Sequence, residues 1–373
     1  MYFPIKLILL IAVVATLTGG ALSQTPGSTT TDVAFASTVA STKTDSSVPI
    51  TVAPISPAMP KATPTPTPAS GDNHAYVKFT AYYFKVSRSG GDPAVINSNA
   101  GGLISSIDSF NYGWELAYKG EAGWNASNGF GFRGSYFYTK QSAEENRTGS
   151  ATAPFIVSPR PLNVTFTGAA DANTPATFRE RFKLQVIDLE GTYKWQDPSW
   201  SVIVSAGVRI ALSRQTYTAQ DTFVGTTENV SYIQKRTGYG PTGAVDFRHQ
   251  IGGSGFWWTG TARFAYLTGK INESASYTAG TFSQTPTRTS GRKNWVFEGE
   301  TGLEWVHNIG GGNNELFLNG SFIYHNWNNI VNVMPTSAVG GSATASLDNP
   351  SLPPTKKGSI SFMGGAFTIG FRF

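Results

Sequence analysis

The stretch "GAFTIGFRF", residues 365–373, alternates strictly between apolar side chains and small or polar ones. The apolar positions are Phe367, Ile369, Phe371 and Phe373, and the intervening positions are Ala366, Thr368, Gly370 and Arg372. Successive side chains of a β-strand point to opposite faces, so this pattern predicts a strand with one fully apolar face. Terminal segments usually fray in water. An aromatic ladder at this position therefore predicts a strand that is paired inside a sheet.

The same period of two recurs from residue 74 onward, whereas no segment there sustains a period of 3.6 residues. The clearest case is "FNYGWELAYK", residues 110–119, in which every second residue is aromatic or Leu. We identify about ten such segments. They cover residues 75–87, 108–120, 129–141, 180–195, 200–218, 236–250, 256–270, 292–307, 315–328 and 359–373.

The connections between these segments alternate between short and long. The short ones are "EAGWNASN", "QDPS", "IGGSG" and "NIGGGNN"; the long ones are residues 88–107, 142–179, 219–235, 271–291 and 329–358. Short turns on one side and long loops on the other are typical of transmembrane barrels, with the turns in the periplasm. The sequence therefore predicts an all-β fold, an antiparallel transmembrane β-barrel of about ten strands, with about eight and twelve as bounds.

Composition fits a membrane barrel better than a water-soluble domain. Charged residues make up only 14% of the chain and aromatic residues 13%, with 41 Gly, whereas charged residues are roughly 25% of an average soluble domain. The net charge of +5 is not gathered in any run of Lys or Arg, which argues against nucleic-acid binding. There is no Cys, so no disulfide contributes to the fold.

Aromatic residues cluster near the ends of the predicted strands, as in the girdles of outer-membrane barrels. One girdle, next to the short turns, comprises Trp195, Trp200, Trp258 and Trp305; the other comprises Tyr83, Phe110, Tyr138, Tyr239, Tyr266, Trp295 and Tyr324. Trp295 and Trp305 lie on one strand at a separation that corresponds to a height of about 25 Å, the thickness of the apolar band of such a barrel.

Charged residues fall on the opposite parity, which predicts that they face the lumen. The predicted inward set is Lys78, Glu115, Arg133, Glu190, Lys194, Arg209, Asp246, Arg248, Arg263, Glu298, Glu300, Glu304 and Arg372. A lipid-facing charge costs a few kcal/mol at mid-depth, so this register is strongly favoured. In the segment 180–195 the apolar phase changes between Val186 and Ile187. That change predicts a β-bulge, or else a stretch that lies outside the membrane.

The N-terminal part has a different character. Residues 1–23 carry Lys6, an apolar run and a cleavage site with small residues, as in a secretory signal peptide. Residues 24–73 are rich in Ser, Thr, Pro and Ala, which predicts a disordered periplasmic linker, with a wall-binding or glycan-bearing stalk as the alternative. Residues 74–373 form the predicted outer-membrane barrel. An even number of strands places both of its termini in the periplasm.

The amino-acid sequences of several predicted strands are distinctive. "GFGFRGSYFYTKQSA" (residues 129–143), "VIDLEGTYKW" (186–195), "SVIVSAGVRIALSRQTYTA" (201–219) and "GYGPTGAVDFRHQIGGSG" (238–255) resemble the pore-forming major-outer-membrane-protein family first named from Legionella. The resemblance covers residues 75–373. It implies an outer-membrane barrel that forms a pore, and it carries no catalytic signature.

Two functions remain open at this stage. The first is a narrow pore for ions or small polar solutes, lined by the inward charges. However, a barrel of about eight strands is just filled by side chains, and ten strands lie close to that limit. Bulky residues also share the inward parity, namely Phe137, Trp257, Phe317, Ile323 and Phe362. The alternative is a structural or adhesive surface barrel with a side-chain-filled lumen and functional extracellular loops.

An enzyme is not expected. The chain has four His, of which only His325 is predicted near the outer end, and it shows no nucleophile elbow, metal-binding His pair or phosphate loop. We therefore expect no catalytic residues, no metal and no cofactor. The expected partners are outer-membrane lipid, ions or small solutes, and the barrel-assembly machinery, since a strand that ends on Phe373 resembles the signal which that machinery recognises. The oligomeric state is left open.

Overall fold

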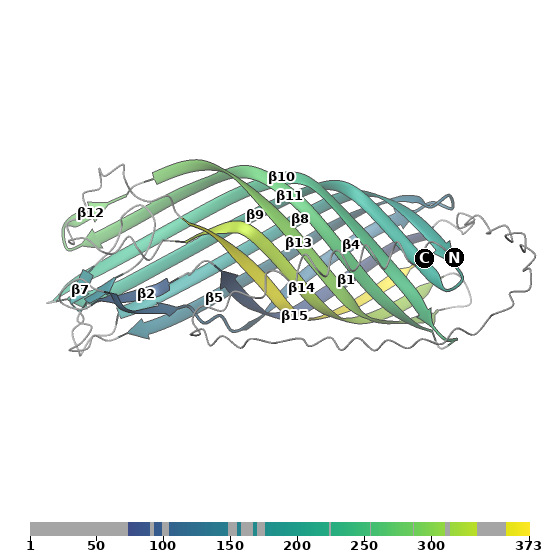
Figure 1. Ribbon diagram of the computed structural model, residues 1–373, viewed down its shortest axis with the longest axis horizontal. Helices are drawn as coiled ribbons and strands as arrows, with labels where there is room; N and C mark the ends of the chain where they lie inside the picture. Colours follow the sequence, from purple (N-terminus) through teal and green to yellow (C-terminus); the bar gives the residue numbers. More distant parts are fainter. Residues whose placement is uncertain are drawn as a thin grey trace, which may run out of the picture. The chain divides into compact units, whose positions relative to one another are not determined.

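The computed structural model describes residues 74–89, 93–98, 104–147, 155–157, 167–169, 176–223, 225–253, 255–285, 287–309, 314–333 and 356–373 (Figure 1). Its long strands are β1 (His74–Ser89), β4 (Trp114–Asn125), β5 (Phe130–Arg147), β8 (Ala176–Asp197), β9 (Trp200–Phe223), β10 (Thr226–Ile251), β11 (Phe256–Ala279), β13 (Thr287–Asn308), β14 (Glu315–Val333) and β15 (Lys356–Arg372). Short strands are β2 (Pro93–Ser98), β3 (Ile104–Ser109), β6 (Phe155–Val157), β7 (Thr167–Ala169) and β12 (Phe282–Gln284). Within this part of the chain no helix is long and apolar enough to cross a membrane.

The ten long strands form one closed antiparallel barrel. They pair in the order β10-β9-β8-β5-β4-β1-β15-β14-β13-β11, and β11 pairs again with β10. The terminal ladder is the seam: β15 lies between β14 and β1, with Phe371 opposite Val77. Ala75 and Phe373 exchange backbone hydrogen bonds of 2.9 and 3.0 Å. Closure leaves no barrel edge unpaired, and it confirms the predicted fold and strand number.

The two ends of the barrel differ. At the turn end, β4–β5, β8–β9, β10–β11 and β13–β14 are joined by short connections, residues 126–129, 198–199, 252–255 and 309–314. Figure 1 shows the C-terminus at this end, and β2, β7 and β12 at the opposite end. There, β3, β2, β6 and β7 form a separate four-stranded sheet in that order.

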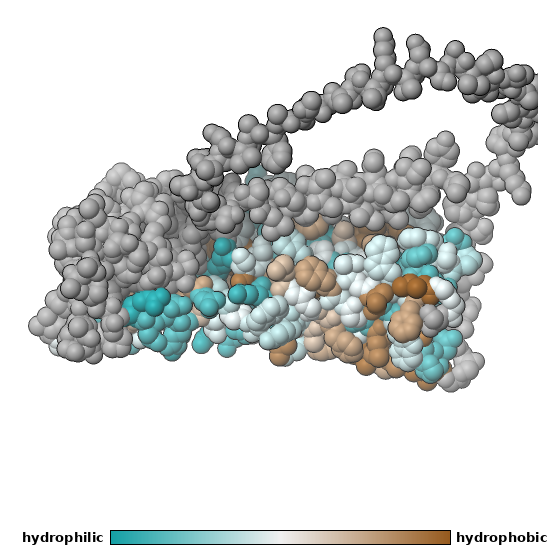
Figure 2. Space-filling model, turned by 60° about the horizontal axis from the view of Figure 1, so that its bottom comes forward, coloured by the Kyte–Doolittle hydropathy of each residue, from teal (hydrophilic) through white to brown (hydrophobic). Residues whose placement is uncertain are grey.

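The outer surface carries an apolar band next to the turn end, which we call the membrane band. Exposed members include Phe79, Leu116, Phe132, Leu189, Val208, Phe264, Leu303, Phe322 and Phe367. Aromatic pairs lie along its rim away from the turn end: Tyr83 stacks on Trp114 at 5.1 Å, and the tilted rings of Tyr266 and Trp295 are 4.4 Å apart. In Figure 2 the brown, hydrophobic residues gather in the right-hand part of the described surface and teal residues lie to their left. A closed barrel with such a band is a transmembrane barrel of the outer-membrane type.

Beyond the membrane band the strands continue, and the polarity of their two faces is reversed. In β8 the outer residues Ile187 and Leu189 are apolar within the band, while Asp188 and Glu190 face inward. Nearer the start of the strand, Phe182 and Leu184 are buried inside the barrel, and Arg181 and Lys183 are exposed outside. We call this second part the extension. It includes residues 176–184 of β8, 214–223 of β9 and 226–237 of β10.

The predicted bulge between Val186 and Ile187 is wrong. The β5–β8 and β8–β9 pairings run through this point without a register shift. The apolar phase changes because the surroundings of the barrel change, not because the strand does. Instead, β14 is irregular: its pairing with β15 shifts between Trp327 and Val331, around Asn329 with φ of 55°. Because of this irregularity the adjacent residues Ile330 and Val331 are both buried, whereas Trp327 already faces inward by the regular alternation.

Several predicted boundaries are also wrong. Residues 219–235 and 271–291, which were expected to be loops, belong mainly to β9, β10, β11 and β13. The segment predicted as 108–120 begins as a barrel strand only at Trp114 and continues to Asn125. Phe110 and Tyr112 precede that strand and are buried inside. The signal peptide and linker predicted for residues 1–73 lie outside the described residues.

Candidate functional site in the barrel lumen

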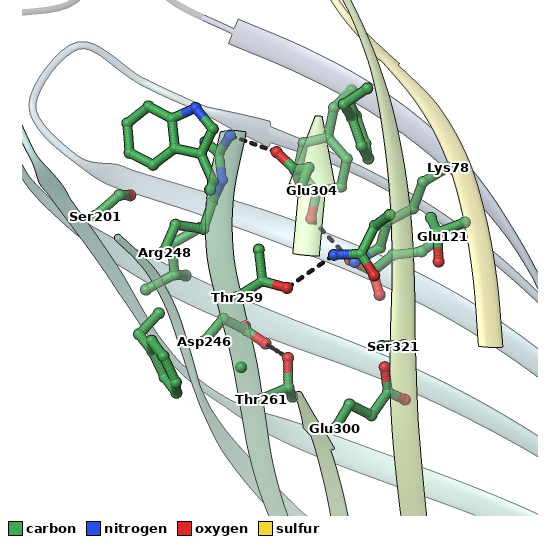
Figure 3. Close-up of a pocket in the computed structure, with 18 of the residues that line it drawn as sticks. Lys78, Glu121, Ser201, Asp246, Arg248, Thr259, Thr261, Glu300, Glu304 and Ser321 are labelled. Carbon is green, nitrogen blue, oxygen red and sulfur yellow. Dashed lines mark hydrogen bonds and ion pairs between the residues drawn. The ribbon is translucent and has the colours of Figure 1, made fainter. Parts of the chain in front are cut away.

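A cavity of about 300 Å³ lies in the lumen on the turn-end side. Its wall is polar and carries both charges. Arg372 donates to Glu304 at 3.0 Å and to Glu315 at 2.7 Å, and Arg248 pairs with Glu304. Figure 3 shows Arg248 and Glu304 reaching toward each other, with Asp246 and Thr261 deeper in the cavity. We call this space the vestibule.

Above the vestibule the lumen is crossed by a network of arginines and carboxylates, which we call the ionic plug. It comprises Arg133, Arg209, Arg263, Asp188, Glu190, Asp246 and Glu298. Arg133, Arg209 and Arg263 are 5%, 1% and 3% exposed, respectively. They come from β5, β9 and β11 and their partners from β8, β10 and β13, so the network ties together six strands across the lumen.

Arg209 is the centre of the plug. Its guanidinium donates to both oxygens of Asp188, at 2.7 and 2.9 Å, and to both oxygens of Glu298, at 2.7 and 2.8 Å. Such two-pronged pairing is the strongest geometry available to a guanidinium and a carboxylate. Arg263 lies against the same two acids, at 3.4 and 3.5 Å, and also pairs with Glu190.

Arg133 links the plug to the vestibule. It donates to Glu190 and to Asp246, each at 2.5 Å, and to the hydroxyl of Ser205 at 2.7 Å. Asp246 also accepts from Thr261 at 2.7 Å. All donors of the guanidinium that face the lumen are therefore used, which satisfies the requirement for burying a charge.

An aromatic cluster fills the other side of the lumen at the same level. Tyr82 meets Phe137 edge to face at 5.6 Å, and His325 contacts both rings at 6.0 and 6.3 Å. Glu300 accepts from Tyr82 at 3.2 Å and lies 3.4 Å from the ring nitrogen of His325. The Arg209 guanidinium lies 5.5 Å from the Trp327 ring, and this contact connects the ionic plug with the aromatic cluster. Charges and rings therefore occupy opposite sides of the lumen at this level.

The interior of the extension resembles the core of a soluble protein. Phe84 packs on Phe362 at 4.9 Å, and Phe110 meets Tyr217 edge to face at 6.1 Å. The buried carboxylate of Glu180 in this core accepts from Arg88 at 2.7 Å, Tyr112 at 2.9 Å and Gln215 at 2.5 Å.

Arg236 is a buried cation at the end of this core next to the membrane band. It donates to the carbonyl of Asn329 at 3.0 Å and to the side chain of Asn294. Burial, and then the neighbouring Arg292, lower its pKa to about 10. The irregular part of β14 is thereby held against β10.

The structure places the residues predicted from sequence as follows. Lys78, Glu115, Arg133, Arg209, Asp246, Arg248, Arg263, Glu298, Glu300, Glu304 and Arg372 all lie on the inner-face parity of their strands. Trp195, Trp200, Trp258, Trp305, Tyr83, Tyr138, Tyr266, Trp295 and Tyr324 lie on the outer parity, as do Phe367, Ile369, Phe371 and Phe373. Apart from Glu115, which lies opposite Phe84, the inward residues form two groups, the vestibule wall and the plug.

Sequence reasoning missed two acids and misplaced one histidine. Asp188 was overlooked because a bulge was expected beside it, although it shares the parity of Glu190. Glu121 was assigned to a turn, whereas it lies in β4 and pairs with Lys78 at 2.9 Å. His325 was expected near the outer end, but it is buried in the lumen beside Glu300. Phe110 was placed in a girdle, but it faces inward.

The described residues contain no group of acids and histidines arranged to hold a metal ion. The clustered carboxylates of the plug are already paired with arginines. The plug therefore has the chemistry of a structural ion-pair network, in which every acid has a cationic partner.

The solved structures that resemble this chain include outer-membrane β-barrels. No family model matches the chain, and no curated protein matches it. Similar solved structures include the outer membrane protease OmpT from Escherichia coli, with 10% identity, 83% of this chain and 99% of that chain covered, and a TM-score of 0.41. A Pseudomonas aeruginosa FadL homologue has 8% identity, coverage of 81% and 90%, and a TM-score of 0.25. Ail of Yersinia pestis has 10% identity, coverage of 81% and 100%, and a TM-score of 0.21. These likenesses carry no information on function, and the resemblance to the Legionella-type family stays a prediction.

Proposed function

We propose that this protein is an outer-membrane barrel whose lumen is closed at rest and whose extension stands outside the cell as a rigid surface structure. The turn end then faces the periplasm, in keeping with the short periplasmic turns of such barrels. The role is structural or adhesive, exercised by the extension and the connections that it carries.

The observation that carries this proposal is the continuous filling of the lumen above the vestibule. Arg133, Arg209 and Arg263 are buried among acids, and the aromatic cluster of Tyr82, Phe137, His325 and Trp327 occupies the remaining cross-section. A resting aqueous channel needs a continuous open path, and buried aromatic and aliphatic side chains occupy the interior of the extension.

The height of the extension supports a role outside the membrane. Residues 214–223 of β9, at ~3.3 Å per residue and a tilt of ~40°, rise by about 25 Å, comparable with the membrane band itself. A pore through the membrane does not require a second hydrophobic core of this size. A stalk that holds loops away from the lipid surface does.

Because the chain contains no Cys, single introduced cysteines can test directly which end of the barrel faces the outside of the cell. Single cysteines are introduced at Thr218, on the outer face of the extension, and at Ser199, in the turn between β8 and β9. A membrane-impermeant maleimide should label Thr218→Cys in intact cells. Ser199→Cys should react only after the outer membrane is permeabilised. The reverse pattern would overturn the proposed orientation.

Conductance recordings in planar bilayers test whether the lumen is closed. The wild-type protein should give no stepwise conductance, while Arg209→Ala should give openings because the centre of the plug is removed. Arg214→Ala, which loses the same charge from the outer face, serves as the control and should stay silent. Regular wild-type steps would overturn the closed barrel.

A gated narrow pore is the second candidate, and the vestibule favours it. This cavity of about 300 Å³ is lined by Arg133 and Asp246 of the plug. Opening would require the ion pairs of Arg209 and Arg263 to exchange partners. Wild-type steps whose ion preference changes in Glu300→Ala, which lines the vestibule, would identify this candidate.

The terminal ladder also supports assembly in the outer membrane. Phe367, Ile369, Phe371 and Phe373 present four exposed apolar side chains at the seam, and we propose that they are read by the barrel-assembly machinery. Phe373→Asp should reduce the amount of heat-modifiable, folded barrel in cells. Refolding of the same variant in detergent should be much less affected.

A further inference from the structure

Four cationic side chains stand side by side on the outer face, immediately above the membrane band. Lys140 lies opposite Lys183, Lys183 opposite Arg214, and Arg214 opposite Lys235. All four are exposed, and together we call them the basic row. Because neighbouring strands are about 4.8 Å apart, the row extends for about 14 Å across β5, β8, β9 and β10.

The basic row has no counter-charge of its own. The outer-face positions next to it along the strands are Tyr138, Ser142, Arg181, Gln185, Leu212, Thr216, Ile233 and Thr237, none of which is acidic. Within the described residues no ion pair involves any of the four cations. Farther out, by contrast, Arg179 is paired with Glu144 at 2.6 Å. Like charges directly opposite each other on a sheet are destabilising. An external anion bound to the row would relieve this repulsion.

The surface directly below the row is apolar. Ile187, Ile210 and Leu212 are exposed on β8 and β9, and Tyr136 and Tyr239 are exposed on the flanking strands. The cations therefore stand at the level of the lipid headgroups, over a column that contacts acyl chains. A soluble anion would contact only the basic row. An anionic lipid would contact the basic row with its headgroup and the apolar surface below it with its acyl chains.

Three other exposed cations have no cation directly opposite them, although Lys270 is the diagonal neighbour of both Lys235 and Lys293. Lys85 lies opposite Trp114 and Met363, Lys270 opposite Thr237 and Gly291, and Lys293 opposite Thr268. The succession of facing cations is thus confined to one sector of the barrel and is not a general property of the rim.

We propose that the basic row binds the phosphate groups of an anionic lipid in the leaflet on the extension side, with its acyl chains against Ile187, Ile210 and Leu212. Lys140, Lys183 and Lys235 supply ammonium groups, and Arg214 supplies a planar fork that matches phosphate oxygens. A headgroup with two phosphates fits a row of this length better than one with a single phosphate.

The test compares two variants with equal loss of charge. The row variant combines Lys183→Gln, Arg214→Gln and Lys235→Gln, and the control combines Lys85→Gln, Lys270→Gln and Lys293→Gln. Each protein is placed in phosphatidylcholine nanodiscs with increasing diphosphoryl lipid A, and bound lipid is measured by native mass spectrometry. The row variant should bind about a hundredfold more weakly than wild type. The control should stay within about threefold of wild type.

Three results would overturn the proposal: equal weakening in both variants, unchanged binding in the row variant, or full competition by inorganic pyrophosphate at the concentration of the lipid. The first would indicate bulk charge and the last a free anion. Folding is checked by heat-modifiable gel mobility in phosphatidylcholine alone. There the row variant should be at least as stable as wild type because repulsion is relieved; failure to fold would mean that the cations serve the fold, and would also overturn the proposal.

Discussion

The membrane band and the extension are built from the same strands but distribute polarity in opposite ways. Within the band, Leu189 and Val208 face outward and Asp188 and Arg209 face inward. In the extension, Arg181 and Arg214 face outward while Phe182 and Tyr217 are buried. The backbone pairing is continuous between the two.

The difference shows that alternation defines a strand but not which of its faces is apolar. Lipid requires an apolar exterior, which leaves polar residues for the interior, where each charge needs a partner. Where water surrounds the barrel, the exterior can carry charge and the interior can form an ordinary hydrophobic core. The ionic plug lies at the membrane level because only there is the interior obliged to be polar.

The largest effect is expected from breaking the plug. Arg209→Ala leaves Asp188 and Glu298 buried with Arg263 as their remaining cation, and should lower the free energy of unfolding by about 3–5 kcal/mol. The measurement is urea-induced unfolding in lipid vesicles, followed by tryptophan fluorescence.

The matched control removes an arginine from the other region. Arg179→Ala breaks an exposed pair with Glu144 and should cost less than about 1 kcal/mol. Similar losses for the two variants would mean that the interior at membrane level is well solvated, contrary to the filled lumen described above.

A smaller effect is expected from placing a charge on the outer face. Leu189→Arg, at a position 56% exposed in the middle of the membrane band, should cost about 2–4 kcal/mol. Thr218→Arg, on the outer face of the extension, should change stability by less than about 0.5 kcal/mol. The same unfolding assay in lipid vesicles compares them. A costly Thr218→Arg would place that part of β9 inside the membrane and remove the distinction between the two regions.

The architecture could be predicted from sequence because the barrel's alternation is regular. Strand number, the antiparallel order and the seam between β15 and β1 follow from period two and from the alternation of short and long connections. The inward parity of Arg133, Arg209 and Arg263 also follows, since a charge in lipid is costly.

The extension could be predicted only in part. The change of phase at Val186 was interpreted either as a bulge or as a stretch outside the membrane, and residues 219–235 were interpreted as a loop, because period two along one strand does not show how far the barrel continues beyond the lipid. The pairing of Arg209 with Asp188 and Glu298 likewise depends on which strands meet across the lumen, and periodicity along one strand carries no information on that. The burial of Phe110 and Tyr112 likewise depends on contacts with β8 and β9, and the alternation along one strand carries no information on these contacts.

The smallest of the expected effects concerns the interior of the extension. Tyr112→Phe removes a hydroxyl that donates to Glu180 at 2.9 Å but keeps the ring beneath the Arg88 guanidinium, which lies 4.5 Å from it. Because Glu180 still accepts from Arg88 and Gln215, the loss should be about 1 kcal/mol. Tyr239→Phe, exposed at the rim of the membrane band, should leave stability nearly unchanged. If the extension is a dry core, Tyr112→Phe should also speed limited proteolysis between β3 and β4, and equal proteolysis of the two variants would indicate that water already reaches Glu180.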